Sequence, residues 1–330
     1  MSSTRLPVKI SIVMPVFNGE KFLREAIESV LAQTVTEFTF WIGDNVSTDC
    51  TAKIVESYAD PRIRFVKNSR NLGIYGNVNN LIRQAEGDLV QIVCADDRLL
   101  PDCLENQIKV FERHPDLSFV YCDTTATDFG QARPPRRYQG ELPNVLFPVA
   151  GGLSLFCFGC LPGDMTNVML RKECFSAVGG FREDLPYAGD FDLWARLSAA
   201  YSFGLNRRKL TFEREHAGRA SQTMTKNCAH IWQADIILEG LFSRVPSEHR
   251  WLVKAHGTMF HASHFMLHGL NAALRGQFRT AGLVWRRRSY SFSNVWALLF
   301  IITSLNHRIS TGWTCRRLLV AIERANGPTR

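Results

Sequence analysis

The sequence contains no Gly-x-Gly motif, although 23 of its 330 residues are glycine. Closely spaced glycines let a loop approach the pyrophosphate of a dinucleotide, and a related glycine-rich loop holds the phosphates of ATP in P-loop proteins. Neither the dinucleotide fingerprint nor a Walker loop is present. Their absence argues against dinucleotide-dependent dehydrogenases and against P-loop kinases.

The cysteines do not suggest a disulfide framework. There are nine of them, an odd number, and they are scattered through apolar segments. Reduced, buried thiols in a cytosolic protein fit this pattern better than disulfide bonds. Cys157 and Cys160 form a lone Cys-x-x-Cys pair, with no second pair to complete a zinc site.

Acidic residues are scarce in the last third of the chain. Residues 231–330 contain thirteen Lys and Arg against four Asp and Glu, a balance of +9, so residues 1–230 carry −1 of the total of +8. Residues 289–307 contain no Lys, Arg, Asp or Glu, but their continuous apolar core, 295–302, has only eight residues. A membrane-spanning helix needs about 20 predominantly apolar residues.

We therefore expect residues 226–330 to form a basic helical region that lies on a membrane surface. Its arginines would face anionic headgroups, with Trp285, Trp296 and Trp313 at the interface. A helical bundle with a solvated basic face is the alternative. Nucleic-acid binding is not expected, because no recognised nucleic-acid module accompanies the charge.

The N-terminal residues predict no signal peptide. Their apolar run, 10–17, contains Pro15 and leads directly into a helix start, with no segment of the kind that a signal peptidase cleaves. Together with the basic apolar region near the other end of the chain, this predicts a cytoplasmic protein. We expect it to be peripheral on the inner face of the plasma membrane.

Strand and helix patterns alternate over residues 8–122. Repeated strand–helix units with short connections predict an α/β fold, with a mostly parallel sheet flanked by helices. The predicted strands are 8–14, 38–42, 63–66, 89–94 and 118–122, and the intervening helices carry apolar residues at helical spacing.

The regular alternation ends after residue 122. Residues 123–164 are rich in Gly, Pro and Arg and are predicted to form loops over the sheet. Residues 165–170 predict another strand and 192–200 a helix, and after Ser221 the pattern is helical almost throughout.

The apolar run 89–95 ends in two adjacent carboxylates, Asp96 and Asp97. Unpaired carboxylates at the end of a buried strand are costly, and a hard divalent cation with a phosphate behind it would be a suitable partner. Turn chemistry explains an Asp-Asp pair equally well. Further acidic residues recur where strands should end or helices begin: Asp44, Asp190 and Asp192.

A series of motifs in residues 8–221 resembles glycosyltransferase family 2. The series begins with Val13-Met14-Pro15-Val16-Phe17-Asn18-Gly19, and the later motifs follow in the family's order. They are Asp44-Asn45-Val46-Ser47-Thr48-Asp49, Asn71-Leu72-Gly73, Gly87-Asp88, Ala95-Asp96-Asp97, Val178-Gly179-Gly180-Phe181, Gly189-Asp190-Phe191-Asp192-Leu193-Trp194 and Arg214-x-His216-x-Gly218-x-x-Ser221.

The resemblance implies a GT-A catalytic domain over residues 1–225 and an inverting transfer of a sugar from a nucleotide-sugar donor. The helical region 226–330 would follow it. A Mn²⁺ or Mg²⁺ ion would stabilise the charge that grows on the diphosphate leaving group. The expected acceptor is a hydroxyl of a glycan or lipid-linked intermediate in surface polysaccharide or lipopolysaccharide biosynthesis, and uridine diphosphate is the favoured nucleotide.

The resemblance also assigns roles to individual residues. Asp190 corresponds to the general base, and Asp192, which also suits a helix-capping role, is the alternative. Asp96 and His216 correspond to metal-binding positions, and Asp97 and Arg214 would support them. The expected donor-binding residues are Pro15, Phe17, Asn18, Asp44, Asn45 and Asp96.

Two positions depart from the family pattern. Cys94 replaces the first aspartate of the DXD element, and a thiol is a poor ligand for hard cations. Gly189 replaces the acidic residue that usually precedes the general base. A catalytically silent scaffold protein of a polysaccharide assembly complex is therefore an alternative. A sugar-nucleotide pyrophosphorylase is another, although the glycine-rich loop of such enzymes is absent.

Overall fold

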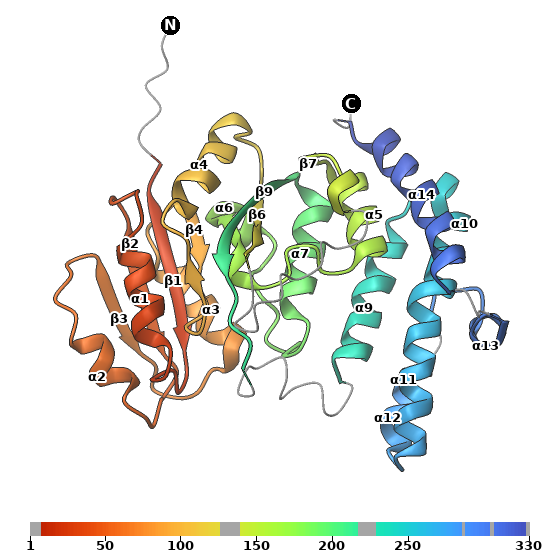
Figure 1. Ribbon diagram of the computed structural model, residues 1–330, viewed down its shortest axis with the longest axis horizontal. Helices are drawn as coiled ribbons and strands as arrows, with labels where there is room; N and C mark the ends of the chain where they lie inside the picture. The colour runs from red at the N-terminus through yellow and green to blue at the C-terminus, as the bar shows by residue number, and fades with distance from the viewer. Residues whose placement is uncertain (1–7, 126–138, 217–228, 286–287, 304–306, 328–330) are drawn as a thin grey trace, which may run out of the picture. The chain divides into compact units, whose positions relative to one another are not determined.

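The structure, a computed structural model, describes residues 8–125, 139–216, 229–285, 288–303 and 307–327 (Figure 1). Of residues 139, 229, 284, 302–303 and 307–313 it describes the backbone alone. The chain forms two compact units. The first comprises residues 1–134, 162–193 and 201–215, and the second comprises 135–161, 194–200 and 216–330. The second unit thus includes two segments that precede the predicted domain boundary at 225.

The first unit is built on a mixed sheet in the order β3-β2-β1-β4-β8-β6-β9-β5. Pairs β1–β2, β2–β3, β1–β4 and β6–β9 are parallel, whereas β8 is antiparallel to β4 and β6, and β5 is antiparallel to β9. The strands are β1 (Ile10–Val16), β2 (Thr39–Asp44), β3 (Ile63–Lys67), β4 (Leu89–Ile92), β5 (Arg98–Leu99), β6 (Phe119–Thr124), β8 (Val168–Arg171) and β9 (Phe203–Phe212).

The flanking helices bury one apolar face each, as their sequence spacing predicts. In α1, for example, Leu23, Ala26, Ile27 and Val30 are buried. The helices of this unit are α1 (Leu23–Leu31), α2 (Thr51–Glu56), α3 (Gly73–Gln84), α4 (Cys103–Arg113), the 3₁₀ turn η2 (Met165–Asn167), α6 (Lys172–Ala177) and the first turn of α7 (Gly189–Ala200). These elements confirm the predicted α/β class.

The register of the central strands places three loops at one edge of the sheet. Val16 at the end of β1 pairs with Asp44 at the end of β2. On the other side of β1, Val13 pairs with Ile92, the last residue of β4. Because these three strands are parallel, the segments that follow them, including Asn18, Asp44 and Asp96, leave the same edge.

The second unit is helical apart from the short strand β7 (Val145–Leu146). Helix α5 packs against α9 and α14. The elements are η1 (Gln139–Glu141), α5 (Pro148–Phe158), α9 (Ala229–Ser243), α10 (Ser247–His256), the π-helical turn η4 (Gly257–Ala262), α11 (Ser263–Leu274), α12 (Phe278–Val284), α13 (Asn294–Thr303) and α14 (His307–Ala325). In the part of the chain that the structure describes, no helix has both the length and the apolarity needed to cross a bilayer.

The structure differs from the predicted secondary structure at several places, of which α5 and β9 are the longest. Residues 148–158, predicted as loop, form α5, because Pro148 occupies the first turn of a helix, where proline is tolerated, and the following residues are buried. Strand β9 was missed because the polar run Asn206-Arg207-Arg208-Lys209 interrupts its apolar residues. These four side chains are half-buried or exposed, which is compatible with a strand although it breaks the pattern.

Two buried histidines complete the carboxyl end of α5. The last carbonyl groups of a helix have no partner within the helix. His261 Nε2 lies 2.6 Å from Phe156 O, and His256 Nε2 lies 3.3 Å from Cys157 O. Both histidines flank or belong to the π-helical turn η4, which therefore places two ring nitrogens against one helix end.

Candidate active site

The loops after β1 and β2 are joined by side-chain hydrogen bonds. The Asn18 backbone N–H donates to Ser47 Oγ at 2.8 Å, and Asn18 Oδ1 accepts from the Thr48 N–H at 2.8 Å. Asn18 and Val46 both have positive φ, at 50° and 68°. A β-branched residue in this region is a strained outlier, of the kind that clusters at functional sites.

The predicted donor-binding residues lie at this strand edge. Asp44 is buried at the end of β2, and its Oδ1 accepts from the Ser47 N–H at 3.0 Å. No other hydrogen bond to this carboxylate is present among the described residues. Pro15 lies in β1 beside Gly43, and Phe17, just past the strand, is 53% exposed. An acceptor oxygen and an exposed ring beside a strained loop are suitable for binding a base and ribose.

Asn45, which is also predicted to bind the donor, makes its hydrogen bonds within the protein. Its Nδ2 donates to Asn71 Oδ1 and Gly73 O, and its Oδ1 accepts from the Leu72 N–H and from Asn68 Nδ2. An amide can make four hydrogen bonds, so this side chain has its full complement inside the protein. It therefore holds residues 68–73 against the end of β2. Direct contact with a donor would require one of these bonds to break.

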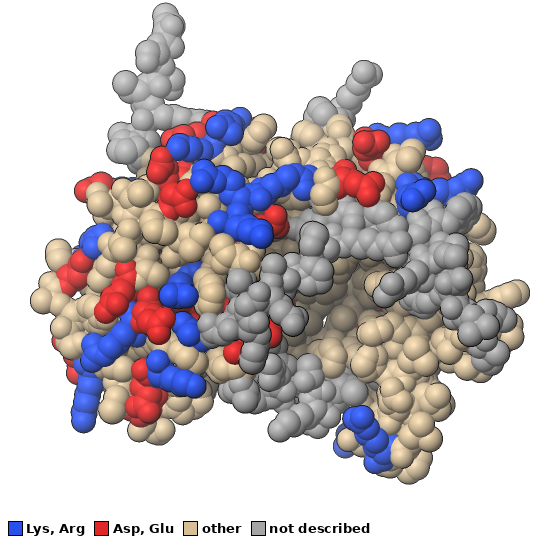
Figure 2. All heavy atoms as spheres, in the orientation of Figure 1, with Lys and Arg blue, Asp and Glu red and all other residues tan. Residues whose placement is uncertain are grey.

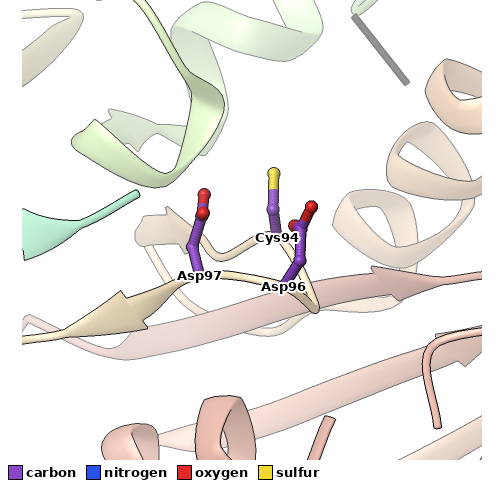
Figure 3. A group of neighbouring side chains, drawn as sticks. All are labelled: Cys94, Asp96 and Asp97. Carbon is purple, nitrogen blue, oxygen red and sulfur yellow. The ribbon is translucent and has the colours of Figure 1, made fainter. Parts of the chain in front are cut away.

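Beyond β4, three potential metal ligands point to the same side of one loop (Figure 3). The ligand atoms of Cys94, Asp96 and Asp97 lie within 4.8 Å of one another. Burial, with Asp164, Asp97 and Asp96 nearby, raises the pKa of the Cys94 thiol. A thiol is also a poor ligand for hard cations, so the oxygens of Asp96 are the better candidates for Mn²⁺ or Mg²⁺.

The buried carboxylate of Asp97 is used to hold this loop. Its Oδ2 accepts from Thr166 Oγ1 at 2.7 Å, and its Oδ1 accepts from the Arg214 N–H at 2.9 Å. Arg214 also donates from Nε to Asp96 O and from a terminal nitrogen to Glu25 Oε2, and its guanidinium lies 4.5 Å from the centre of the Phe22 ring. Asp97 and Arg214 thus hold the loop that carries Asp96.

Asp164 is a site residue that the sequence analysis missed. It lies 70 positions from Cys94, yet its Oδ1 accepts from Cys94 Sγ at 3.2 Å. The same carboxylate caps η2 by accepting from the Thr166 N–H. Because Cys94 replaces an aspartate of the family pattern, Asp164 brings a carboxylate to the same corner from another segment. Its place at the end of an apparent loop gave no signal in the sequence.

Asp190, the predicted base, lies in the first turn of α7. Burial, together with the nearby Asp164 carboxylate, raises the pKa of its carboxyl to about 6, although hydrogen bonds from Phe191 and Tyr75 act to lower it. A carboxylate that titrates near neutral pH is a stronger base than ordinary aspartate and is still mostly ionised at pH 7. Asp190 is therefore suited to accept a proton from a hydroxyl group.

Tyr75 explains the unusual Gly189. A Cβ atom at position 189 would lie 2.6 Å from the Tyr75 ring, so no larger residue fits there while the ring stays in place. The Tyr75 hydroxyl oxygen accepts from the Asp190 N–H at 3.2 Å. The ring of Tyr75 stacks on that of Phe181, with centroids 5.1 Å apart. Where the family pattern has an acidic residue, an aromatic side chain from α3 thus packs against Gly189 and contacts Asp190.

The remaining two predicted residues are placed less directly. Asp192 is buried, and its Oδ1 lies 3.9 Å from Arg182, which itself pairs with Asp184 at 2.6 Å. His216 is half-buried, belongs to the second compact unit and is not among the converging ligands of the described residues. Its predicted role as a metal ligand stays a prediction.

The sequence matches a known family over much of the first unit. Residues 11–166 match the model of glycosyl transferase family 2. These residues form a glycosyltransferase family 2 domain. This glycosyltransferase is 26% identical over 258 residues to an uncharacterized glycosyltransferase of Rickettsia typhi, covering 76% of this chain and 77% of the relative. It is 39% identical over 116 residues to one of Methanocaldococcus jannaschii, covering 34% and 40%.

Solved structures share the fold of this glycosyltransferase. Residues 1–349 of Staphylococcus aureus TarS, in complex with UDP, give a TM-score of 0.62 at 16% identity, covering 97% of this chain and 93% of that one. The mannosyltransferase PcManGT of Pyrobaculum calidifontis, in complex with GDP-Man and Mn²⁺, gives 0.57 at 16% identity, covering 97% and 87%. These likenesses confirm the GT-A fold that the motif series implied.

Proposed function

We propose that this glycosyltransferase transfers a sugar, with inversion, from a nucleoside diphosphate donor to a hydroxyl group of a glycan or lipid-linked acceptor. The observation that carries this proposal is the Asp190 carboxyl, whose pKa of about 6 suits a general base. Asp164 interacts both with Asp190 and with the group formed by Cys94, Asp96 and Asp97. It raises the pKa of Asp190 and accepts a hydrogen bond from Cys94. A base and an acidic group for the leaving diphosphate thus lie in one unit.

The donor would bind along the strand edge. The free acceptor capacity of Asp44 and the exposed ring of Phe17 support contacts to the nucleoside, while Asn18 and Asn45 fix the loops around it. The relative TarS is known with UDP and with UDP-GlcNAc, and PcManGT with GDP-Man. We favour a uridine diphosphate donor, in keeping with the family.

Asp96 would hold the divalent cation, with His216 as the second candidate. A bound Mn²⁺ or Mg²⁺ would supply positive charge to the diphosphate as the anomeric bond breaks. PcManGT is known with Mn²⁺. Asp97 and Arg214 would keep Asp96 in place, and Cys94 would remain a neutral thiol beside it.

Transfer then requires one proton movement and one displacement. The acceptor oxygen attacks the anomeric carbon while its proton passes to a carboxylate oxygen of Asp190. The bond from the anomeric carbon to the phosphate oxygen breaks, and the nucleoside diphosphate leaves with its electrons. Attack from the face opposite the leaving group inverts the anomeric centre. We propose that the acceptor belongs to surface polysaccharide or lipopolysaccharide biosynthesis at the inner membrane face.

The proposal is tested with a panel of UDP-, GDP- and dTDP-sugars in the presence of Mn²⁺. Release of nucleoside diphosphate is measured with and without candidate acceptors, and donor binding is measured separately by calorimetry. We expect release from one nucleotide class, stimulated by an acceptor. If the folded protein neither binds nor turns over any of the donors, the result would favour the scaffold alternative. Formation of inorganic pyrophosphate would favour a pyrophosphorylase.

Asp44→Asn supplies the matched test of the donor site. It should weaken donor binding about tenfold, because it removes one charged hydrogen-bond acceptor. The control is Asp88→Asn, a carboxylate at the start of β4 that accepts from the Lys9 N–H, away from the strand edge that carries the site. Equal donor affinity for Asp44→Asn and the wild type would contradict the placement of the nucleoside.

A further inference from the structure

Helices α11 and α12 form a hairpin whose turn exposes two large apolar side chains. Leu274, the last residue of α11, is 77% exposed, and Phe278, the first of α12, is 74% exposed. They are the two most exposed large apolar side chains among the described residues. The turn itself is well formed, with Gly276 at φ +75° and the Gln277 N–H donating to Ala272 O at 2.9 Å.

The apolar exposure continues along the neighbouring helices. On α11, Leu267 and Leu270 are 41% and 46% exposed, and with Leu274 they follow the i, i+3, i+7 spacing of one helix face. Helix α13 packs against α11 and exposes Val295 and Trp296 at 66% and 61%. Large exposed apolar side chains gathered on neighbouring helices mark a contact with a protein or with a lipid surface.

The charge of this region distinguishes between these two partners. Residues 249–322, a run of 74, contain ten Lys and Arg and no Asp or Glu. Arg275 and Arg279 are exposed and alternate in the turn with Leu274 and Phe278. Where Figure 2 shows the end of the α11–α12 hairpin, blue arginine atoms lie among tan ones without red atoms.

A second copy of the chain is a poor partner for this turn. A two-fold contact would bring Arg275 and Arg279 against their own copies, and the region has no acidic side chain to pair with them. An anionic lipid bilayer offers what both kinds of side chain need. Its interface accepts Leu and Phe side chains, and its headgroups attract arginine.

We propose that the α11–α12 turn docks on an anionic lipid surface, with Leu274 and Phe278 inserted and Arg275 and Arg279 at the headgroups. This deepens the proposed function, on which it rests for its biological meaning, because it names the surface that would bring the enzyme to a lipid-linked acceptor. The face of α11 and the exposed part of α13 would lie along the same interface. Binding does not require a donor, so it can be measured apart from catalysis.

The test is flotation of the full-length protein with vesicles of phosphatidylglycerol and phosphatidylcholine, compared with vesicles of phosphatidylcholine alone. Leu274→Ser with Phe278→Ser should lower the partition coefficient by about 100-fold, because two large side chains lose their apolar contact. Arg275→Gln with Arg279→Gln should lower it about tenfold on anionic vesicles and leave it unchanged on neutral ones. The control Ile236→Ser, at a 44% exposed position of α9, should bind as the wild type does.

Three results would overturn the proposal. The first is wild-type binding by the serine double variant, and the second is equal binding to anionic and neutral vesicles. The third is a dimer without vesicles that the serine double variant dissociates, which would make the patch a contact between copies. Thermal unfolding should match the wild type in both double variants, since the four side chains are exposed. Donor turnover without vesicle binding would refute this inference alone, and vesicle binding without turnover would refute the proposed function alone.

Discussion

Burial acts on ionisable groups in both units, with opposite consequences. In the first unit it raises the pKa of Asp190 to about 6, and in the second it lowers the pKa of His256 to about 4 and that of His261 to about 3. In each case the neutral form is favoured, because a charge loses its hydration. Asp190 is still mostly ionised at neutral pH, whereas both histidines stay uncharged there.

The difference lies in how the three groups are surrounded. Asp190 is partly exposed, accepts hydrogen bonds from N–H groups and has a second carboxylate nearby, so its proton can be gained and lost. His256 and His261 are both buried, and each places a ring nitrogen beside a carbonyl oxygen at the end of α5. The same desolvation thus gives a carboxyl group with a pKa near neutral pH in one unit and a pair of uncharged imidazoles at a helix end in the other.

The largest expected effect is on transfer by Asp190→Asn. Loss of a general base should lower kcat about 1000-fold, with donor affinity nearly unchanged. Asp192→Asn is the matched control, since Asp192 lies in the same turn and contacts Arg182 at 3.9 Å. It should retain activity within a few-fold of wild type. Full activity of Asp190→Asn together with an inactive Asp192→Asn would assign the base to Asp192.

Acid should destabilise the fold through the two histidines. Their pKa values are depressed in the folded state, so below about pH 6.5 the unfolded chain binds more protons. Lowering the pH from 7 to 5 should remove about 2 kcal/mol of unfolding free energy for each histidine. Urea unfolding at both pH values should show this loss in the wild type and much less of it in His256→Gln with His261→Gln. The exposed His114→Gln is the control, and an unchanged pH dependence of the double variant would contradict the expectation.

Asp190 should shift stability in the opposite direction. Its folded pKa is raised, so between about pH 6 and 4 the folded state binds more protons and gains stability as the pH falls. Above pH 6 the ionised carboxylate costs the fold about 3 kcal/mol. Asp190→Asn should therefore unfold at higher urea concentration than wild type at pH 7.5, although it is inactive. A lower midpoint would show that the carboxylate stabilises the fold.

The smallest expected effect comes from Tyr75→Phe. Tyr75 contacts Asp190 and its hydrogen bond lowers the pKa of that carboxyl. Without the hydroxyl group this pKa should rise, so the acid limb of the kcat/KM profile should move to higher pH, with kcat reduced only a few-fold. Tyr58→Phe, a phenol that contacts Glu28 in the same unit, is the control. A pH profile that does not move would limit Tyr75 to packing on Gly189.

The ordered motifs predicted the fold class well, because strand ends, glycine turns and helix faces are local features. The β-α alternation to residue 122, the strand edge with Asp44 and Asp96, and the helical character of the described residues after 229 all follow from local spacing. Helix α5 and strand β9 were missed for the same reason. Their local composition resembles loops, and only packing against other elements stabilises them.

The sequence by itself determined which residues are available as a base and as oxygen ligands, since Asp190 and Asp96 stand in recognisable local patterns. The tertiary structure alone decided that Asp164 and Tyr75 join them, because contacts across 70 and 115 positions depend on how the sheet and its helices pack. It also decided the protonation of these groups. A carboxyl and an imidazole have fixed pKa values in water, and only the depth and the partners that folding gives them move those values toward or away from neutral pH.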